Sequence, residues 1–372
     1  MKLRLFFLLA ILATVILSTG CGLFEGTLLG PTDTATVIAK TAQIRTSYSV
    51  VAADLLEVKR GDKLDVLDQV EFEKTPWYRV RAHDETQTEG WIEAQFVITS
   101  GTLEKSKELA EQFKDQPPQA AGTIRSPSNL RGAPEINPEN VLFKLAQGST
   151  FEIIQWKFVP KQEAPDVDDA PKGQQKPGKK VTKKVDDDEP PKLDELYDMW
   201  YLVRLDPSVS PAPAGWLFGR QVELQVPSDI SFFQQNNRKF VTWQRLDADT
   251  ANKVGAGDKS LAPGSWVILA RDAYSKPIDG VEPDFDYILV LAFDKYDQNY
   301  YTVWRTTSRK QIWGRLPLKV EGKGDNKTFS ITLRNPQTGA MEEKRFIVFK
   351  DKTRLRVTPP EDIAQYETNE AN

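Results

Sequence analysis

The sequence is nearly free of the two side chains on which most nucleophilic and zinc-dependent catalysis depends. Among its 372 residues there is one cysteine, Cys21, and one histidine, His83. A cysteine nucleophile needs a histidine base within reach, and a zinc site needs several imidazole or thiolate ligands. A single cysteine also forms no disulfide within the chain. We therefore expect no enzyme activity, no metal and no cofactor, although paired carboxylates stay possible in so acidic a chain.

Positive charge is not in excess either. The 49 Lys and Arg residues are outnumbered by 53 Asp and Glu residues, which gives a formal net charge of -4. Proteins that bind nucleic acid usually carry a basic face, and nucleotide-binding proteins often carry a glycine-rich phosphate loop. Neither pattern is present in the sequence. We expect no nucleic-acid partner.

The longest apolar run lies at the N-terminus. A positively charged start precedes the apolar stretch from Leu5 to Leu17, and small residues follow as far as Cys21. This order is typical of an export signal, and the run is too short for a membrane span of roughly 20 residues. We expect residues 1–20 to be a signal peptide and residues 21–35 to be a tether.

A series of short motifs occurs twice in the same order. The first copy contains Ile44-Arg45, Gly61, Trp77-Tyr78-Arg79-Val80-Arg81 and Gly90-Trp91, and the second contains Leu130-Arg131, Gly148, Trp200-Tyr201-Leu202-Val203-Arg204 and Gly215-Trp216. Apolar and polar residues alternate around these motifs, as in strands with one buried face. The repeat predicts two β modules of one kind, at residues 36–99 and 119–229.

Each copy resembles the bacterial SH3 domain, a small β-barrel module common in secreted and envelope proteins. The resemblance covers about half of the mature chain and depends on the motifs given above. It implies binding of cell-wall glycan or peptide, or of protein partners, rather than catalysis.

Cys21 follows Ser18-Thr19-Gly20, which is similar to the lipobox of bacterial lipoproteins. The resemblance implies that Cys21 carries acyl chains that hold the protein on a membrane, and two or more chains give stable anchoring. Gly22 in the next position resembles lipoproteins sorted to the outer membrane. We therefore expect a lipid-anchored protein of the bacterial cell envelope, on the periplasmic face of the outer membrane.

Aromatic residues in both modules are the candidate ligand contacts, because aromatic faces suit sugar rings and dominate many interfaces. They are Tyr48, Trp77, Tyr78 and Trp91 in the first module, and Trp200, Tyr201 and Trp216 in the second. The alternative is that the tryptophans form the barrel cores. The binding hypothesis requires at least one of them per module to be exposed in a groove.

The remaining segments are expected to be a helix, a loop, a β domain and a tail. A helix from Thr102 to Gln116, within a linker at 100–118, has one apolar face that packs on a neighbouring barrel or binds a partner. Charged, proline-rich residues 161–196 form a disordered insertion. Residues 230–357 form an antiparallel meander or barrel, either a degenerate third copy or a separate barrel with a cavity, and residues 358–372 form a frayed tail.

The sequence thus predicts an all-β protein made of two small SH3-like barrels and a C-terminal antiparallel β-barrel or meander, with one linker helix. We expect a non-enzymatic lipoprotein that binds peptidoglycan or an envelope protein. Two alternatives stay open. One is a structural subunit of an envelope complex, and the other is a small-molecule or lipid carrier with a cavity in its C-terminal domain.

Overall fold

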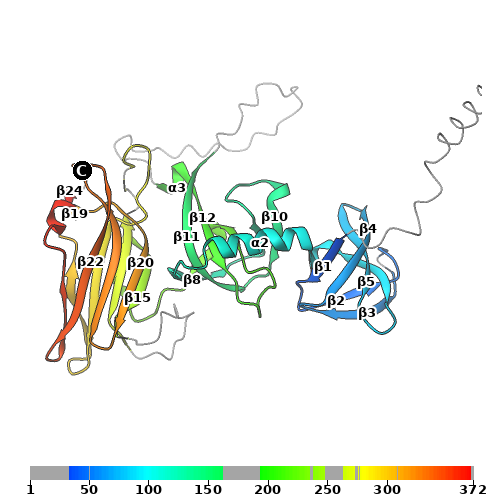
Figure 1. The fold of residues 1–372 in the computed structure, drawn as a ribbon, viewed down its shortest axis with the longest axis horizontal. Coiled ribbons are helices and arrows are strands. Elements are labelled where there is room, and N and C mark those ends of the chain that lie inside the picture. Colours follow the sequence, from blue (N-terminus) through cyan, green and yellow to red (C-terminus); the bar gives the residue numbers. More distant parts are fainter. Residues whose placement is uncertain are drawn as a thin grey trace, which may run out of the picture. The chain divides into compact units, whose positions relative to one another are not determined.

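The structure is a computed structural model that describes residues 33–49, 51–161, 193–234, 238–247, 263–272, 275, 277–307 and 309–369. The expected signal peptide, Cys21, most of the tether and residues 162–192 of the insertion lie outside the described residues. Contacts divide the chain into two compact units, Met1–Leu103 and Glu104–Asn372. The predicted all-β fold is confirmed in both units (Figure 1).

The first unit is a seven-stranded antiparallel sheet in the order β3-β2-β6-β5-β4-β1-β7. Its strands are β1 (Asp33–Val37), β2 (Thr41–Arg45), β3 (Asp54–Lys59), β4 (Lys63–Phe72), β5 (Thr75–Ala82), β6 (Glu89–Glu93) and β7 (Val97–Thr99). The alternating apolar residues form its core, which includes Ile44, Leu64, Val80 and Ile92. The predicted tether is two to three residues too long, because Ala35 pairs with Leu64 and is buried.

The second module has the same strand order, β10-β9-β13-β12-β11-β8-β14. Its strands are β8 (Ala120–Ile124), β9 (Ser128–Arg131), β10 (Val141–Leu145), β11 (Thr150–Pro160), β12 (Tyr197–Arg204), β13 (Ala214–Phe218) and β14 (Val222–Leu224). The register repeats as well, since Arg45 lies opposite Trp91 and Arg131 lies opposite Trp216. The sequence repeat therefore corresponds to one topology built twice.

The glycine before the second tryptophan of each module sits where two strands approach closely. A Cβ atom on Gly90 would lie 2.5 Å from the carbonyl oxygen of Arg45, and one on Gly215 would lie 2.4 Å from Cγ of Leu130. Real Cβ atoms do not approach other atoms so closely. The Gly-Trp motif therefore reflects packing of β6 on β2 and of β13 on β9.

Helix α2 (Ser100–Gln112) follows the first module. The sequence predicted a helix here, but placed both ends too late. Helix α3 (Leu193–Leu196) lies at the end of the predicted insertion, where the amide of Lys161 donates to the carbonyl of Leu196 at 3.0 Å. Residues 161 and 193–196 are thus ordered extensions of β11 and β12, and the expected loop is shorter than predicted.

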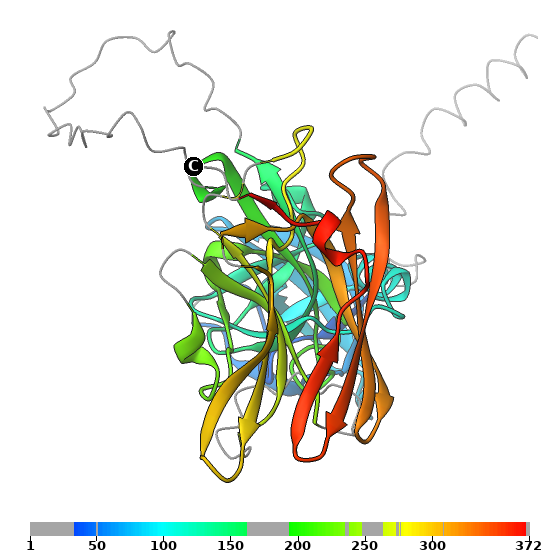
Figure 2. The same cartoon turned by 90° about the vertical axis from the view of Figure 1, so that its left-hand side faces the viewer.

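The C-terminal domain contains two four-stranded antiparallel meanders (Figure 2). One comprises β15 (Arg238–Arg245), β16 (Trp266–Asp272), β17 (Tyr287–Asp294) and β18 (Asn299–Arg305), and the other β20 (Gly314–Lys323), β21 (Asn326–Arg334), β22 (Met341–Asp351) and β23 (Arg354–Thr358). The apolar residues of this region predict six strands, at residues 240–246, 266–270, 287–294, 300–305, 328–333 and 345–350. All six are present, whereas β20 and β23 were not predicted. Five consecutive residues of β17, from 288 to 292, are buried, as expected for a strand covered on both faces. Neither sheet has the strand order of the two modules.

The predicted frayed tail is wrong, because residues after Pro359 pack on the domain. A short 3-10 helix, Ile363–Gln365, is followed by β24 (Thr368–Asn369), which pairs with β19 (Lys310–Gln311). Tyr366 is almost fully buried, with 2% of its surface exposed. One buried aromatic ring in a polar segment is enough to order this end of the chain.

Candidate functional site

Three aromatic rings of the first module lie together and are only partly buried. Tyr48, in the loop after β2, contacts Trp91 edge-on, with ring centroids 5.1 Å apart. Its ring centroid also lies 5.1 Å from that of Phe72 at the end of β4. We call this cluster of Tyr48, Phe72 and Trp91 the Trp91 face. A ligand can contact these rings without any rearrangement of the module's core.

Charged side chains surround the Trp91 face. Arg45 and Arg79 lie opposite Trp91 on the two neighbouring strands. Arg79 and Arg81 both pair with Glu89, at 3.1 and 2.7 Å. The arginine pairs lower the pKa of Glu89, first through the hydrogen bond from Arg81. The combination of aromatic rings with arginines is common at recognition surfaces.

The structure brings Tyr48 and Trp91 together, whereas the other two candidates of this module contribute little exposed ring surface. Tyr78 lies on the same side of β5 as Val80 and packs against the core. Burial, and to a lesser degree the charge of Asp33, raises the pKa of Tyr78. Trp77 is buried, with 7% of its surface exposed. Phe72 is the contact that sequence analysis missed, although it ends an alternating strand.

The three candidates of the second module are all buried. Trp200, Tyr201 and Trp216 are 2%, 5% and 7% exposed, and burial raises the pKa of Tyr201 to about 12. Trp200 and Trp216 form a cluster with Ile154 and Leu202, as the core alternative predicts. These rings leave no face free for a ligand, so we do not include them in a binding surface.

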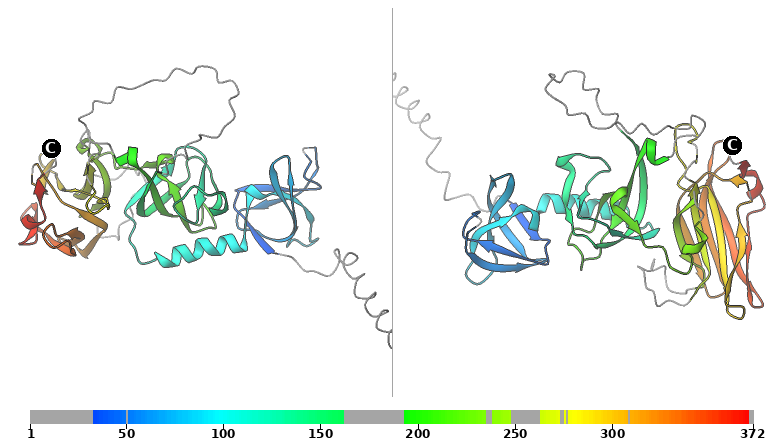
Figure 3. Two further views of the ribbon diagram at one scale, coloured as in Figure 1. Left: turned by 90° about the horizontal axis from the view of Figure 1, so that it is seen from above. Right: turned by 180° about the vertical axis from the view of Figure 1, so that it is seen from behind.

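Helix α2 covers the tryptophan cluster of the second module. The helix runs along this module (Figure 3). Leu109 and, just after the helix, Phe113 pack against the cluster. The Arg204 guanidinium donates to the carbonyl of Phe113 at 3.1 Å, and its Nη2 also lies near the carbonyls of Lys114 and Gln116. The amide of Ala214 donates to Oγ of the buried Ser106 at 3.1 Å. The predicted packing of this helix on a barrel is therefore present.

A buried charged cluster joins the second module to the C-terminal domain, and sequence analysis missed it. Arg271 lies over the ring of Phe158 at 4.1 Å and donates to the carbonyl of Pro283 at 3.3 Å. Burial raises the pKa of Glu282 to about 7, a value that the charges of Arg271 and then Arg315 moderate. Arg315 also pairs with Asp284 at 2.9 Å. The alternating acids in Glu282-Pro283-Asp284-Phe285-Asp286 are the only sequence signal for it.

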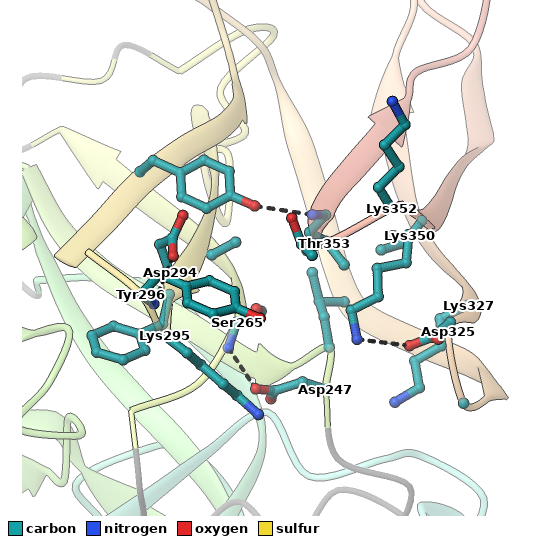
Figure 4. Close-up of a pocket in the computed structure, with 17 residues that line it drawn as sticks. Asp247, Ser265, Asp294, Lys295, Tyr296, Asp325, Lys327, Lys350, Lys352 and Thr353 are labelled. Atoms are coloured by element: carbon teal, nitrogen blue, oxygen red, sulfur yellow. Dashed lines mark hydrogen bonds and ion pairs between the residues drawn. The ribbon is translucent and has the colours of Figure 1, made fainter. Parts of the chain in front are cut away.

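A cleft of about 450 Å³ opens between the two sheets of the C-terminal domain. Figure 4 shows Asp294, Lys295 and Tyr296 on one side and Asp325, Lys350 and Lys352 on the other. Lys350 pairs with Asp325 at 3.2 Å, and Asp247 accepts from the amide of Ser265 at 3.0 Å. A lining of charged side chains suits a hydrophilic molecule and is unfavourable for an acyl chain.

In the described parts of the chain, no group of three or more His, Cys, Asp or Glu side chains is placed to hold a metal ion. None of the helices in the same parts is both long enough and apolar enough to cross a membrane.

Comparison with known proteins adds little. No family model matches the chain, and no curated protein matches it. Among solved structures, the chain is similar to NlpC1 from Trichomonas vaginalis, with 9% identity over 93% of this chain and 99% of that one. The TM-score of 0.15 is too low to establish a shared fold. The function must therefore be argued from the residues themselves.

Proposed function

We propose that this protein is a non-enzymatic envelope lipoprotein, anchored by acyl chains on Cys21, whose first module recognises a cell-wall component or an envelope protein. The observation that carries the recognition role is the Trp91 face. Tyr48 contacts both of the other rings and all three stay partly exposed, while the corresponding tryptophan of the second module is buried. A soluble fold gains stability by burying such rings, so a cluster left partly open is best explained by an intermolecular contact.

The polar lining of the C-terminal cleft argues against the lipid-carrier alternative. A carrier for acyl chains needs a mostly apolar cavity, whereas the cleft is lined by four lysines and three aspartates. Recognition through the first module is therefore the better supported function.

Binding to purified sacculi and to envelope extract tests the proposal. Full-length protein should be retained by one of the two, and Trp91→Ala should reduce retention at least tenfold. Glu104→Ala, an exposed substitution in helix α2, is the control. Retention that is equal for both variants would rule out the Trp91 face as the recognition surface.

The anchor has a separate test. Intact mass of protein extracted from membranes should show acyl chains on Cys21, and Cys21→Ser should release the protein from the membrane. A membrane-extracted protein whose mass contains no lipid would contradict the proposed localisation.

A further inference from the structure

The two modules can be aligned residue by residue through their strand pairing. In the first module Arg79 lies opposite Trp91 and Trp77 opposite Glu93. In the second, Leu202 lies opposite Trp216 and Trp200 opposite Phe218. Both modules also have a β-bulge at the same place, after Val66 and after Ile153. Trp77, Arg81 and Trp91 therefore occupy the positions of Trp200, Arg204 and Trp216.

In the second module, helix α2 packs on the residues at these positions. Leu109 of α2 and Phe113, the residue directly after it, pack on the tryptophan cluster. Arg204 donates to the carbonyl groups of residues 113, 114 and 116, in the turn that follows the helix. The module thus supplies an apolar platform for one helix face and an arginine that binds the chain just after the helix.

The first module keeps both parts of this arrangement, and its Trp91 and Arg81 are partly accessible, whereas Trp77, the counterpart of Trp200, is buried. Trp91 is partly exposed, and the ring of Tyr48 contacts it edge-on. Arg81 is held only by its pair with Glu89, and the side chains of both residues are about a third exposed. Exposed ion pairs contribute little to stability, so a carbonyl group can replace Glu89 at small cost.

The platform of the first module is more polar. Arg79 takes the place of Leu202, which belongs to the buried cluster of the second module, and Glu93 takes the place of Phe218. A helix that fits here needs a narrow apolar stripe with charged residues beside it.

From this correspondence we propose that the Trp91 face docks an amphipathic helix of a partner protein. The helix presents two apolar side chains four residues apart to Trp91 and Tyr48 and directs its C-terminal carbonyl groups to Arg81. This inference deepens the proposed recognition function and depends on it, because it names the kind of partner. The competing ligand for the same face is wall glycan.

A peptide of this chain's own residues 100–118 is a direct probe, since it is the helix that the equivalent positions already hold. Fluorescently labelled peptide is titrated into full-length protein and its anisotropy is measured. We expect saturable binding, with a Kd in about the micromolar range. A second peptide with Leu109→Ser and Phe113→Ser should bind at least tenfold more weakly.

Protein variants then locate the binding site. Arg81→Gln and Tyr48→Ala should each weaken binding of the peptide at least fivefold, whereas Lys63→Gln, an exposed change in the same module, should leave it unchanged. Thermal unfolding of each variant shows that the module is folded. Absence of saturable binding, or equal binding by Arg81→Gln, Tyr48→Ala and Lys63→Gln, would overturn the proposal.

Failure of this proposal can be told apart from failure of the recognition function. If sacculi retain the protein through Trp91 while the peptide does not bind, the face recognises wall material and the helix partner is wrong. If peptide binding depends on Arg81 and Tyr48 and sacculi do not compete with it, the partner is a protein helix.

Discussion

At the scale of single residues, Glu282 is a buried carboxyl group in unfavourable surroundings. It is 4% exposed and neither of its oxygen atoms has a hydrogen-bond partner. Its pKa of about 7 in the folded protein compares with an ordinary value of 4.5. The folded protein therefore binds this proton more tightly than the unfolded chain does.

The sign of the resulting pH dependence follows from that difference. Between about pH 4.5 and 7 the unfolded chain loses this proton while the native carboxyl keeps it, so Glu282 makes the free energy of unfolding fall as pH rises. The loss reaches up to about 3 kcal/mol, at about 1.4 kcal/mol for each pKa unit. Glu282→Gln should remove it.

Urea unfolding at pH 5 and pH 8 measures this effect. Glu282→Gln should lose less stability between the two pH values than the parent protein, and Glu361→Gln, at an exposed carboxyl, should behave like the parent. The same pH dependence in all three proteins would mean that Glu282 stays ionised throughout.

Two glycines give a second prediction at this scale. Gly215→Ala forces a methyl group onto Leu130 in a strand crossing and should lower the free energy of unfolding by about 1–3 kcal/mol. Gly101→Ala, where nothing lies within 4 Å of the new atom, should raise it by up to about 1 kcal/mol because alanine favours helix. Chemical denaturation of the two variants should give opposite signs. Equal effects would show that the close approach in the sheet relaxes freely.

At the scale of elements, helix α2 is a part of the second module rather than a spacer. Phe113→Ala should lower the stability of that module by about 2 kcal/mol, since the ring is partly buried against Trp200 and Trp216. Glu108→Ala, at an exposed position of the same helix, is the control. Hydrogen exchange of the backbone amides of β12 and β13 reports the module directly, and parent-like exchange for Phe113→Ala would contradict the packing role.

The C-terminal segment gives an equally specific prediction. Tyr366 is buried, its hydroxyl donates to Glu342, and Nζ of Lys344 lies 4.3 Å from its ring centroid. Tyr366→Ala should cost about 3–5 kcal/mol, whereas Tyr366→Phe loses only the hydrogen bond and should cost about 1 kcal/mol. Differential scanning calorimetry of both variants measures the difference. Similar small effects would indicate that the segment is docked only loosely.

Elements were predicted well where the hydrophobic period was strong and poorly where tertiary contacts decide. Strand β17 was found at its observed bounds because its apolar run is continuous. Strand β20 was not predicted because Pro317 and several charged residues interrupt the alternation of apolar and polar residues. Tyr366 shows the same limit, since nothing in the polar residues around it indicates that its ring is buried.

At the scale of the whole molecule, the repeated motifs predicted two equivalent modules, and their shared strand order confirms this. The repeat could not predict that the equivalent surfaces of the two modules differ in exposure. Trp91 and Trp216 each follow a glycine and precede an aliphatic residue, yet one is partly exposed and the other is covered by α2. That difference depends on a segment outside either motif set, so it is visible only in three dimensions.

The short connection between α2 and β8 has a further consequence. Only residues 113–119 separate the helix from the module that it covers, so the local effective concentration of this internal ligand is in about the millimolar range. A free helix at micromolar concentration cannot compete at the second module, which leaves one available site per chain. Weakening the internal ligand with Leu109→Ser and Phe113→Ser should unmask the second site. Titration with the parent peptide would then change in stoichiometry from one helix per protein to two.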